Sequence, residues 1–251
     1  MNSEISYFKD FNLICFDADG VLFDTERFSH IAAYEVLSRF NHKLPKLDVF
    51  SNMLVGIRAK DQKFVIGSKF SQLGFLIIFP DDFEQQRDSR QRELFKERNI
   101  NPITGVVKLL DYLSKNDVDF CISTRSRIEP LIQKLELTGL RKYFPDENIF
   151  YPEGIDDTSI AFKKVKSYMS KQLINEQEFI QDKGLVFAYS CFSMGYVPYD
   201  CVGIEDTISG VKSIISAKMM AIAFGGAEST NSKRLKVFAN NNDVLYLSEF
   251  C

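Results

Sequence analysis

Several residue types that mark common classes of protein are scarce in this sequence. It contains no tryptophan and only two histidines, so a Ser–His–Asp triad or a histidine-based metal site would have to use His30 and His42. The five cysteines are scattered without a CxxC pair, which argues against a zinc site or a disulfide framework and predicts buried thiols in a reducing compartment. We therefore expect any chemistry of this chain to depend on carboxylates.

Long apolar runs and an excess of basic residues are also absent. No uninterrupted apolar run approaches the roughly 18 residues of a membrane span, and the start of the sequence lacks the basic and apolar regions of a secretory signal. The formal net charge is −3, so no basic surplus is available to bind nucleic acid. These absences predict a cytoplasmic protein with no membrane or nucleic-acid partner. The sequence does not determine the oligomeric state, for which a monomer is slightly favoured.

What is present is a large apolar fraction, 45% of 251 residues, arranged in short runs that end in polar residues. Runs of this length, bounded by turn residues, are typical of buried strands. They occupy residues 11–16, 118–122, 201–204, 219–224 and 244–247. Helical patterns lie between them, and strands that alternate with helices predict an α/β fold, a Rossmann-like parallel sheet covered on both faces.

Two segments do not follow this alternation. Residues 25–99 are helical and strongly charged, with no clear buried strand, and they predict an α-helical cap domain inserted after the first strand. Residues 1–24 and 100–251 would then form the α/β core domain. The second segment, residues 155–182, is polar and lysine-rich and predicts an additional helix on that core.

The most informative segment is FDADGVLFDTE, in which Asp17 and Asp19 directly follow an apolar strand. A loop can turn both carboxylates toward one ligand, where they suit a divalent cation, a nucleophile and a proton donor. The alternative is an acidic turn that caps the next helix. Ligands of open α/β sheets bind at the carboxyl ends of the strands, so Asp17, Ser123 and the Glu205–Asp206 pair are expected to converge.

This segment resembles the first motif of the haloacid dehalogenase superfamily, in the helical-cap subgroup of sugar phosphatases and β-phosphoglucomutase-like proteins. Residues 122–124, Ile-Ser-Thr, resemble the second motif, and the stretch that ends at Phe144 resembles the segment after that motif in the family. Residues 202–211, VGIEDTISGV, resemble the fourth motif. The matches succeed one another in the family's order and extend over nearly the whole chain.

The resemblance implies a Mg²⁺-dependent phosphatase. Asp17 would be the nucleophile that forms an aspartyl-phosphate, and Asp19 would be the general acid and then the general base. Ser123 would donate a hydrogen bond to the phosphoryl group, and Mg²⁺ would be held by Asp17, the backbone carbonyl of Asp19 and the Glu205–Asp206 pair. An acid at position 19 favours phosphate esters over halides, because a halide leaves without a proton.

Three further site residues are predicted. Relatives place a phosphate-neutralising lysine in a Lys-Pro pair, which this sequence lacks; we expect Lys183 in that role, with Lys163 and Lys164 as competitors. Thr124 is expected to bind substrate next to the second motif. Arg58 lies in a segment that resembles a cap loop of the family, where it would clamp a second anionic group or remain an ordinary solvated charge.

Two predictions concern the cap itself. Some relatives place a histidine near the start of the first cap helix, but His30 is one residue further from Asp24, so a surface histidine is expected. Residues 84–98 predict a solvated amphipathic helix whose arginines form ion pairs.

The sequence thus favours a phosphohydrolase that acts on a small phosphorylated metabolite, a sugar phosphate. A phosphomutase of the β-phosphoglucomutase type is the alternative within the same chemistry. A catalytically inactive protein that binds a ligand or regulates a partner is the alternative from another class.

Overall fold

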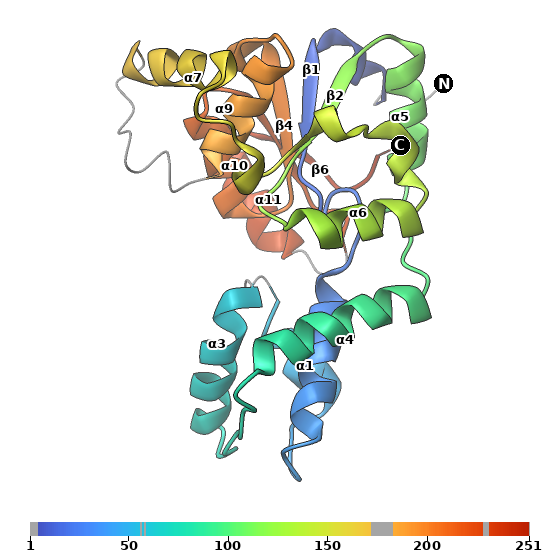
Figure 1. Cartoon of the computed structure of the whole chain (residues 1–251), viewed down its shortest axis with the longest axis vertical. Coiled ribbons are helices and arrows are strands. Elements are labelled where there is room, and N and C mark those ends of the chain that lie inside the picture. Colours follow the sequence, from blue (N-terminus) through green and yellow to red (C-terminus); the bar gives the residue numbers. More distant parts are fainter. Residues whose placement is uncertain (1–4, 56, 58, 172–182, 228–230, 251) are drawn as a thin grey trace. The chain divides into compact units, whose positions relative to one another are not determined.

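The computed structural model describes residues 5–55, 57, 59–171, 183–227 and 231–250. The chain forms two compact units, one made of residues 1–23 and 101–251 and the other of residues 24–100. The first unit carries the sheet and the second is helical (Figure 1). The use of the helical unit as a cap stays a prediction.

The first unit is built on one six-stranded sheet in which every neighbouring pair of strands is parallel. The strands are β1 (Leu13–Phe16), β2 (Asp119–Ser123), β3 (Ile149–Phe150), β4 (Cys201–Glu205), β5 (Met220–Phe224) and β6 (Leu245–Leu247). Five of them fall on the predicted apolar runs. The strand β3, with only two residues, was not predicted, because so short a segment shows no run or period.

Helices cover both faces of this sheet, as the fold-class prediction requires (Figure 1). One face packs against α5 (Val106–Lys115) and α6 (Ile128–Leu137). The other face packs against α7 (Ile160–Lys171), α9 (Gly184–Ser193), α10 (Ile208–Ser216) and α11 (Ser232–Asn241). Short 3₁₀ turns occupy Ile5–Asp10, Leu140–Tyr143, Asp146–Asn148, Pro152–Gly154 and Pro198–Asp200. The predicted Rossmann-like α/β fold is confirmed.

Alternation along β1 explains the two-sided core. Ile14 and Phe16 point into the layer shared with α5 and α6, whereas Leu13 and Cys15 point into the layer shared with α9 and α10. All four are fully buried, as expected for a central parallel strand. Cys15, Cys121, Cys191 and Cys201 are all buried free thiols, as the sequence predicts; Cys251 lies outside the described residues.

The strand order determines where a ligand can bind. The order β3-β2-β1-β4-β5-β6 places β1 beside β4, so the chain runs in one direction along the sheet from β1 to β3 and in the other direction from β4 to β6. In doubly wound sheets the crevice forms at this reversal, outside the carboxyl ends of the strands. The residues that come after β1 and β4 therefore occupy the switch point of the sheet.

The second unit consists of α1 (Glu26–Ser38), α2 (Leu47–Asn52), α3 (Ala59–Gln72) and α4 (Phe83–Glu97). Its core includes Phe50, Phe70 and Phe83, with Phe50 stacked on Phe70. The predicted ion pairs of α4 are present: Arg90 lies 2.5 Å from Glu35, 2.9 Å from Glu93 and 2.7 Å from Glu97. These contacts satisfy the arginine within the unit, as a salt-bridged face requires.

The prediction for His30 is wrong. Its side chain lies on α1 and is 2% exposed. Its Nε2 has no hydrogen-bond partner among the described residues, and burial lowers its pKa to about 4, against a hydrogen bond with the backbone of Leu54 that raises it. The buried face of α1 is wide, since it includes Phe28, Ser29 and Ala32 as well, and it takes in the histidine.

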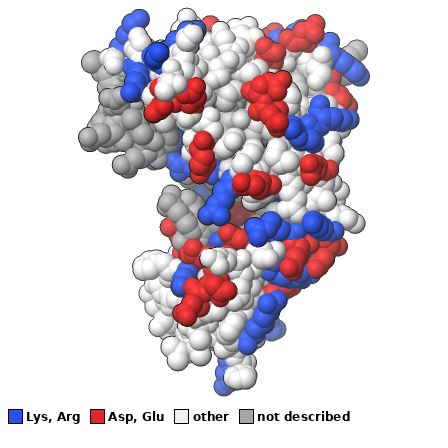
Figure 2. Space-filling model, viewed as in Figure 1, with Lys and Arg blue, Asp and Glu red and all other residues white. Residues whose placement is uncertain are grey.

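The segment 155–182 contains α7 as the predicted additional helix, and its residues 172–182 lie outside the described part of the chain. Among the described residues, no helix has the length and hydrophobicity needed to cross a membrane. On the face seen in Figure 2, acidic and basic side chains are interspersed, in keeping with a net charge of −3.

Candidate active site

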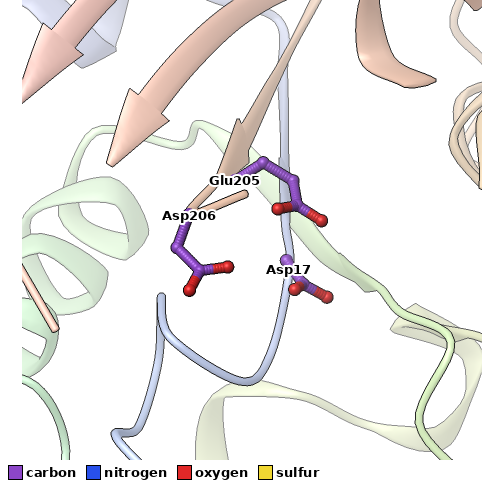
Figure 3. Close-up of side chains that lie close together, drawn as sticks. All are labelled: Asp17, Glu205 and Asp206. Carbon is purple, nitrogen blue, oxygen red and sulfur yellow. The ribbon is translucent and has the colours of Figure 1, made fainter. Parts of the chain in front are cut away.

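Asp17 is the first residue after β1, and the neighbouring strand holds it in place. Its backbone N–H donates to the carbonyl of Ile204 at 3.0 Å, which extends the β1–β4 pairing one residue beyond Phe16. Asp17 consequently faces the end of β4, where Glu205 and Asp206 lie. The predicted convergence of these three carboxylates is present in the structure (Figure 3).

The acidic pair at the end of β4 is ordered by the next helix in the chain. Glu205 Oε2 accepts hydrogen bonds from the N–H and the hydroxyl of Thr207, both at 2.9 Å. Thr207 also caps α10, because its Oγ1 accepts from the Gly210 N–H at 3.0 Å. Gly210 leaves room for the Glu205 carboxyl, since a Cβ there would lie 1.9 Å from its Cδ. The motif thus holds the Glu205 carboxylate in place.

Lys183 lies between Asp17 and Glu205. Its Nζ is 2.5 Å from Asp17 Oδ1 and 2.6 Å from Glu205 Oε1, and it directly precedes α9. The Lys183 and Glu205 side chains are almost fully buried, and Asp17 is 12% exposed. Burial raises the pKa of Asp17 to about 7, even though Lys183 lowers it, and the two carboxylates raise the pKa of Lys183. An ammonium in this place can neutralise an anion bound at Asp17.

The cluster has the composition of a divalent-cation site. Oxygen atoms of Asp17, Glu205 and Asp206 lie within 4.8 Å of one another. When all groups are ionised, three carboxylates and one ammonium leave two negative charges in a largely buried space. A hard divalent cation with oxygen ligands would balance that charge. The residues present therefore fit a divalent metal ion.

Gly20 shapes the loop between Asp17 and the helical unit. Its φ is +82°, a left-handed conformation that favours glycine, and an added Cβ would lie 2.0 Å from Asp206 Oδ2. Its N–H donates to the carbonyl of Phe23 at 2.9 Å, which closes the turn. Both the turn and the close approach of Asp206 require a residue without a side chain here.

Asp19 turns toward α6 and is not part of the three-carboxylate cluster. Its carboxylate pairs with Lys134, at 2.6 Å from Oδ1, and accepts a hydrogen bond from the Ser126 hydroxyl at 2.8 Å. Sequence reasoning missed both partners. Lys134 lies beside the apolar stripe of α6, and a lysine in that place is normally expected to reach solvent with its ammonium group. Its side chain is nevertheless only 5% exposed.

The two residues of the second motif lie in different environments. The Ser123 hydroxyl is completely buried and donates to Ser190 Oγ at 2.8 Å, and Ser190 donates in turn to the Phe187 carbonyl. Thr124 Oγ1 accepts from the N–H of Ser126 at 3.1 Å, so that bond does not use the hydroxyl hydrogen of Thr124. Contact of either residue with a phosphoryl group stays a prediction.

The remaining predicted residues lie away from this cluster or outside the described chain. Lys163 and Lys164 lie on α7 with exposed side chains, so the structure brings Lys183 rather than either competitor to Asp17. Arg58 lies outside the described residues, and its proposed clamp stays a prediction.

A parallel sheet of this order with an acidic cluster at its switch point defines an α/β protein with a candidate site based on carboxylates. The sequence profile of the haloacid dehalogenase-like hydrolases matches residues 14–149, more than half of the chain. The chain belongs to this family, and the prediction of a hydrolase of the haloacid dehalogenase type is confirmed.

Individual relatives are distant. A Drosophila melanogaster protein named "Probable pseudouridine-5'-phosphatase" is 26% identical over 212 residues, which cover 82% of this chain and 78% of the relative. CbbY from Rhodobacter sphaeroides, solved as a mutant with xylulose-(1,5)bisphosphate, has a TM-score of 0.67 and 14% identity over 96% of this chain and 95% of its own. A β-phosphoglucomutase from Clostridium difficile has a TM-score of 0.62 and 18% identity, covering 96% and 92%. The two structures share the fold.

Proposed function

We propose that this chain is a Mg²⁺-dependent phosphatase that cleaves a phosphate ester of a small metabolite, a sugar phosphate, through an aspartyl-phosphate on Asp17. The observation that carries the proposal is the meeting of Asp17, Lys183, Glu205 and Asp206 at the switch point of the sheet. The names of the relatives, a "Probable pseudouridine-5'-phosphatase" and a protein crystallised with xylulose-(1,5)bisphosphate, support this substrate class.

In this mechanism Asp17 attacks phosphorus and the ester oxygen leaves. Lys183, already in contact with the Asp17 carboxylate, neutralises charge on the phosphoryl oxygens. Mg²⁺ held by Asp17, the backbone carbonyl of Asp19, Glu205 and Asp206 would supply further positive charge and orient the phosphoryl group. Thr124, whose hydroxyl hydrogen is not used in its bond with Ser126, can donate to a phosphoryl oxygen, whereas Ser123 would have to exchange its bond to Ser190 for one to the phosphoryl group.

Asp19 acts on the leaving oxygen of the ester and then on the attacking water. An alkoxide is a poor leaving group, so the ester oxygen needs a proton as its bond to phosphorus breaks. Asp19, two residues after the nucleophile, gives that proton and then takes one from the water that hydrolyses the aspartyl-phosphate. Arg58 would contact a second anionic group of the substrate, as expected from its place in the sequence.

A phosphate-release assay with a panel of esters tests the proposal. The panel should include sugar 1- and 6-phosphates, sugar bisphosphates, pseudouridine 5'-phosphate and nitrophenyl phosphate, each with Mg²⁺ and with excess chelator. We expect phosphate release from at least one sugar phosphate that stops in chelator. Conversion of one sugar phosphate isomer to another without phosphate release would instead indicate a phosphomutase, and ligand binding without turnover would indicate a binding protein.

A further inference from the structure

The contact between Lys134 and Asp19 is not needed for the metal cluster or for the nucleophile. Lys134 Nζ lies 2.6 Å from Oδ1 and 2.8 Å from Oδ2 of Asp19, and the Ser126 hydroxyl donates to Oδ2 at 2.8 Å. Both oxygens of the Asp19 carboxylate are thus held by groups from one short segment, the end of the β2–α6 loop and the helix α6.

Packing alone does not account for a lysine at this position. The Lys134 side chain is 5% exposed, and its neighbours on α6, Leu131 and Leu135, are fully buried in the apolar core. Burying an ammonium costs several kcal/mol unless a partner compensates it. An unbranched apolar side chain would fill the same space without that cost. The charge is therefore explained by its contacts, which include Asp19 and the face of the Phe23 ring, 5.1 Å from Nζ.

The geometry of α6 directs the Lys134 side chain toward Asp19. Side chains of an α-helix tilt toward its N-terminus, and Lys134 lies in the second turn of α6. Its stem therefore runs back toward the start of the helix, which comes after the carboxyl end of β2. The adjacent strand β1 ends at the same edge of the sheet, and the loop after β1 carries Asp19. The ammonium and the carboxylate meet at that edge.

We infer that Lys134, assisted by Ser126, is a positioning residue for Asp19 and holds its carboxyl group in one orientation for proton transfer to the leaving oxygen. This inference rests on the proposed function. A group fixed in advance loses no rotamer freedom when the substrate reacts, and catalysis by proton transfer depends on that alignment. The carboxylate of Asp19 is separate from the metal-binding cluster, so its orientation can be changed without removing a metal ligand.

Substrates with different leaving groups separate this role from a structural one. The variants are Lys134→Met, which keeps an unbranched side chain one atom shorter, Lys134→Arg, which restores the charge, and Ser126→Ala. Lys108→Met, at an exposed residue of α5, is the matched control. The value of kcat/KM, which does not include hydrolysis of the common aspartyl-phosphate, is measured for the best sugar phosphate of the panel and for nitrophenyl phosphate, whose leaving phenol is acidic and needs little protonation. Thermal unfolding of each variant reports whether it is folded.

Lys134→Met should lower kcat/KM for the sugar phosphate by about 10²-fold, with a much smaller loss for nitrophenyl phosphate. The reason is that kcat/KM reports the step in which the ester oxygen leaves, and general acid–base catalysis contributes typically 10²–10⁴-fold. Lys134→Arg should recover part of the lost rate, and Ser126→Ala should shift the ratio of the two substrates in the same direction. Lys108→Met should leave both rates unchanged. In an Asp19→Asn background, Lys134→Met should have no further effect on the sugar phosphate, since the two changes remove one function.

Equal losses of kcat/KM for the two substrates in a folded Lys134→Met protein would overturn the inference and leave the proposed function intact. Losses that add in the Asp19→Asn background would do the same. If the unaltered protein releases phosphate from no ester in the panel, the proposed function fails and this inference fails with it.

Discussion

Asp17 lies where the chain leaves the sheet after β1, and this position determines which groups surround it. Its backbone is still paired with Ile204, while its carboxylate is placed against Lys183 and beside the acidic end of β4. The resulting site is largely buried and carries more negative than positive charge, so every single change of a charged residue here is expected to affect metal binding and turnover together.

Lys183→Ala should lower kcat by about 10²–10³-fold, the usual cost of removing one donor that stabilises a developing anion. Lys163→Ala and Lys164→Ala should leave turnover unchanged, because both side chains are exposed on α7. Steady-state kinetics of the three variants check this. A large loss in Lys163→Ala or Lys164→Ala with normal turnover in Lys183→Ala would show that the active-site lysine is wrongly assigned.

Gly20→Ala tests the loop that comes after the nucleophile. It should abolish most turnover and destabilise the protein by more than the roughly 1 kcal/mol that a left-handed backbone costs alanine. The additional loss comes from the clash of its Cβ with the Asp206 carboxylate. Gly74→Ala is the matched control, because Gly74 has the same φ of +82° with nothing within 4 Å of an added Cβ. Equal destabilisation of the two variants in urea would contradict the role of the clash.

At the scale of elements, the buried His30 on α1 predicts a pH dependence of stability. Its pKa is about 4 in the folded protein and 6.5 in the unfolded chain, so the unfolded chain binds more protons between these values. The free energy of unfolding should therefore fall as pH drops from about 6.5 to 4, by up to about 3 kcal/mol from this group, at about 1.4 kcal/mol per pH unit.

Urea unfolding at several pH values measures this effect. His30→Leu should reduce the fall in stability over that range, and the same change at the exposed His42 is the control for loss of a histidine. An unchanged fall in stability in His30→Leu would contradict the assignment of this pH dependence to α1.

Helices and strands were predicted well where the sequence shows a clear apolar pattern. The predictions were poorer where packing decides whether a residue is buried. The apolar runs located β1, β2, β4, β5 and β6, because central parallel strands are buried on both faces and read as continuous apolar runs. The two-residue β3 carries no such pattern. His30 was misplaced because the width of the buried face of α1 depends on the helices packed against it.

The candidate site could also be predicted only in part, because the packing of the helices decides which partners its residues contact. The motifs place Asp17, Glu205 and Asp206 at strand ends, and topology brings strand ends together. The partners of Asp19 could not be found this way, because Lys134 is buried only through the packing of α6 on the sheet. The donation of the Ser123 hydroxyl to Ser190 likewise depends on how α9 packs against β2.

At the scale of the whole molecule, the proposed metal couples activity to stability. The excess of carboxylates over ammonium groups among Asp17, Glu205, Asp206 and Lys183 should make the protein less stable without a cation, and binding at 100 times the Kd should add about 2.7 kcal/mol. Mg²⁺ should therefore raise Tm, and excess chelator should stop turnover. Asp206→Asn should reduce the rise in Tm, whereas Glu249→Gln, at an exposed residue near the C-terminus, should not. Full turnover in excess chelator would contradict the metal assignment.

The central claim, a covalent phosphoryl intermediate on Asp17, is tested most directly by chemical trapping. The variant Asp19→Ala lacks the group proposed to activate water, so with nitrophenyl phosphate and Mg²⁺ it should accumulate the phosphorylated enzyme. Borohydride reduces an acyl phosphate to the alcohol, and peptide mass spectrometry then locates the modified residue. We predict a homoserine side chain at position 17 that requires both substrate and Mg²⁺. Release of nitrophenol with no modification at that position, or with modification elsewhere, would contradict the account.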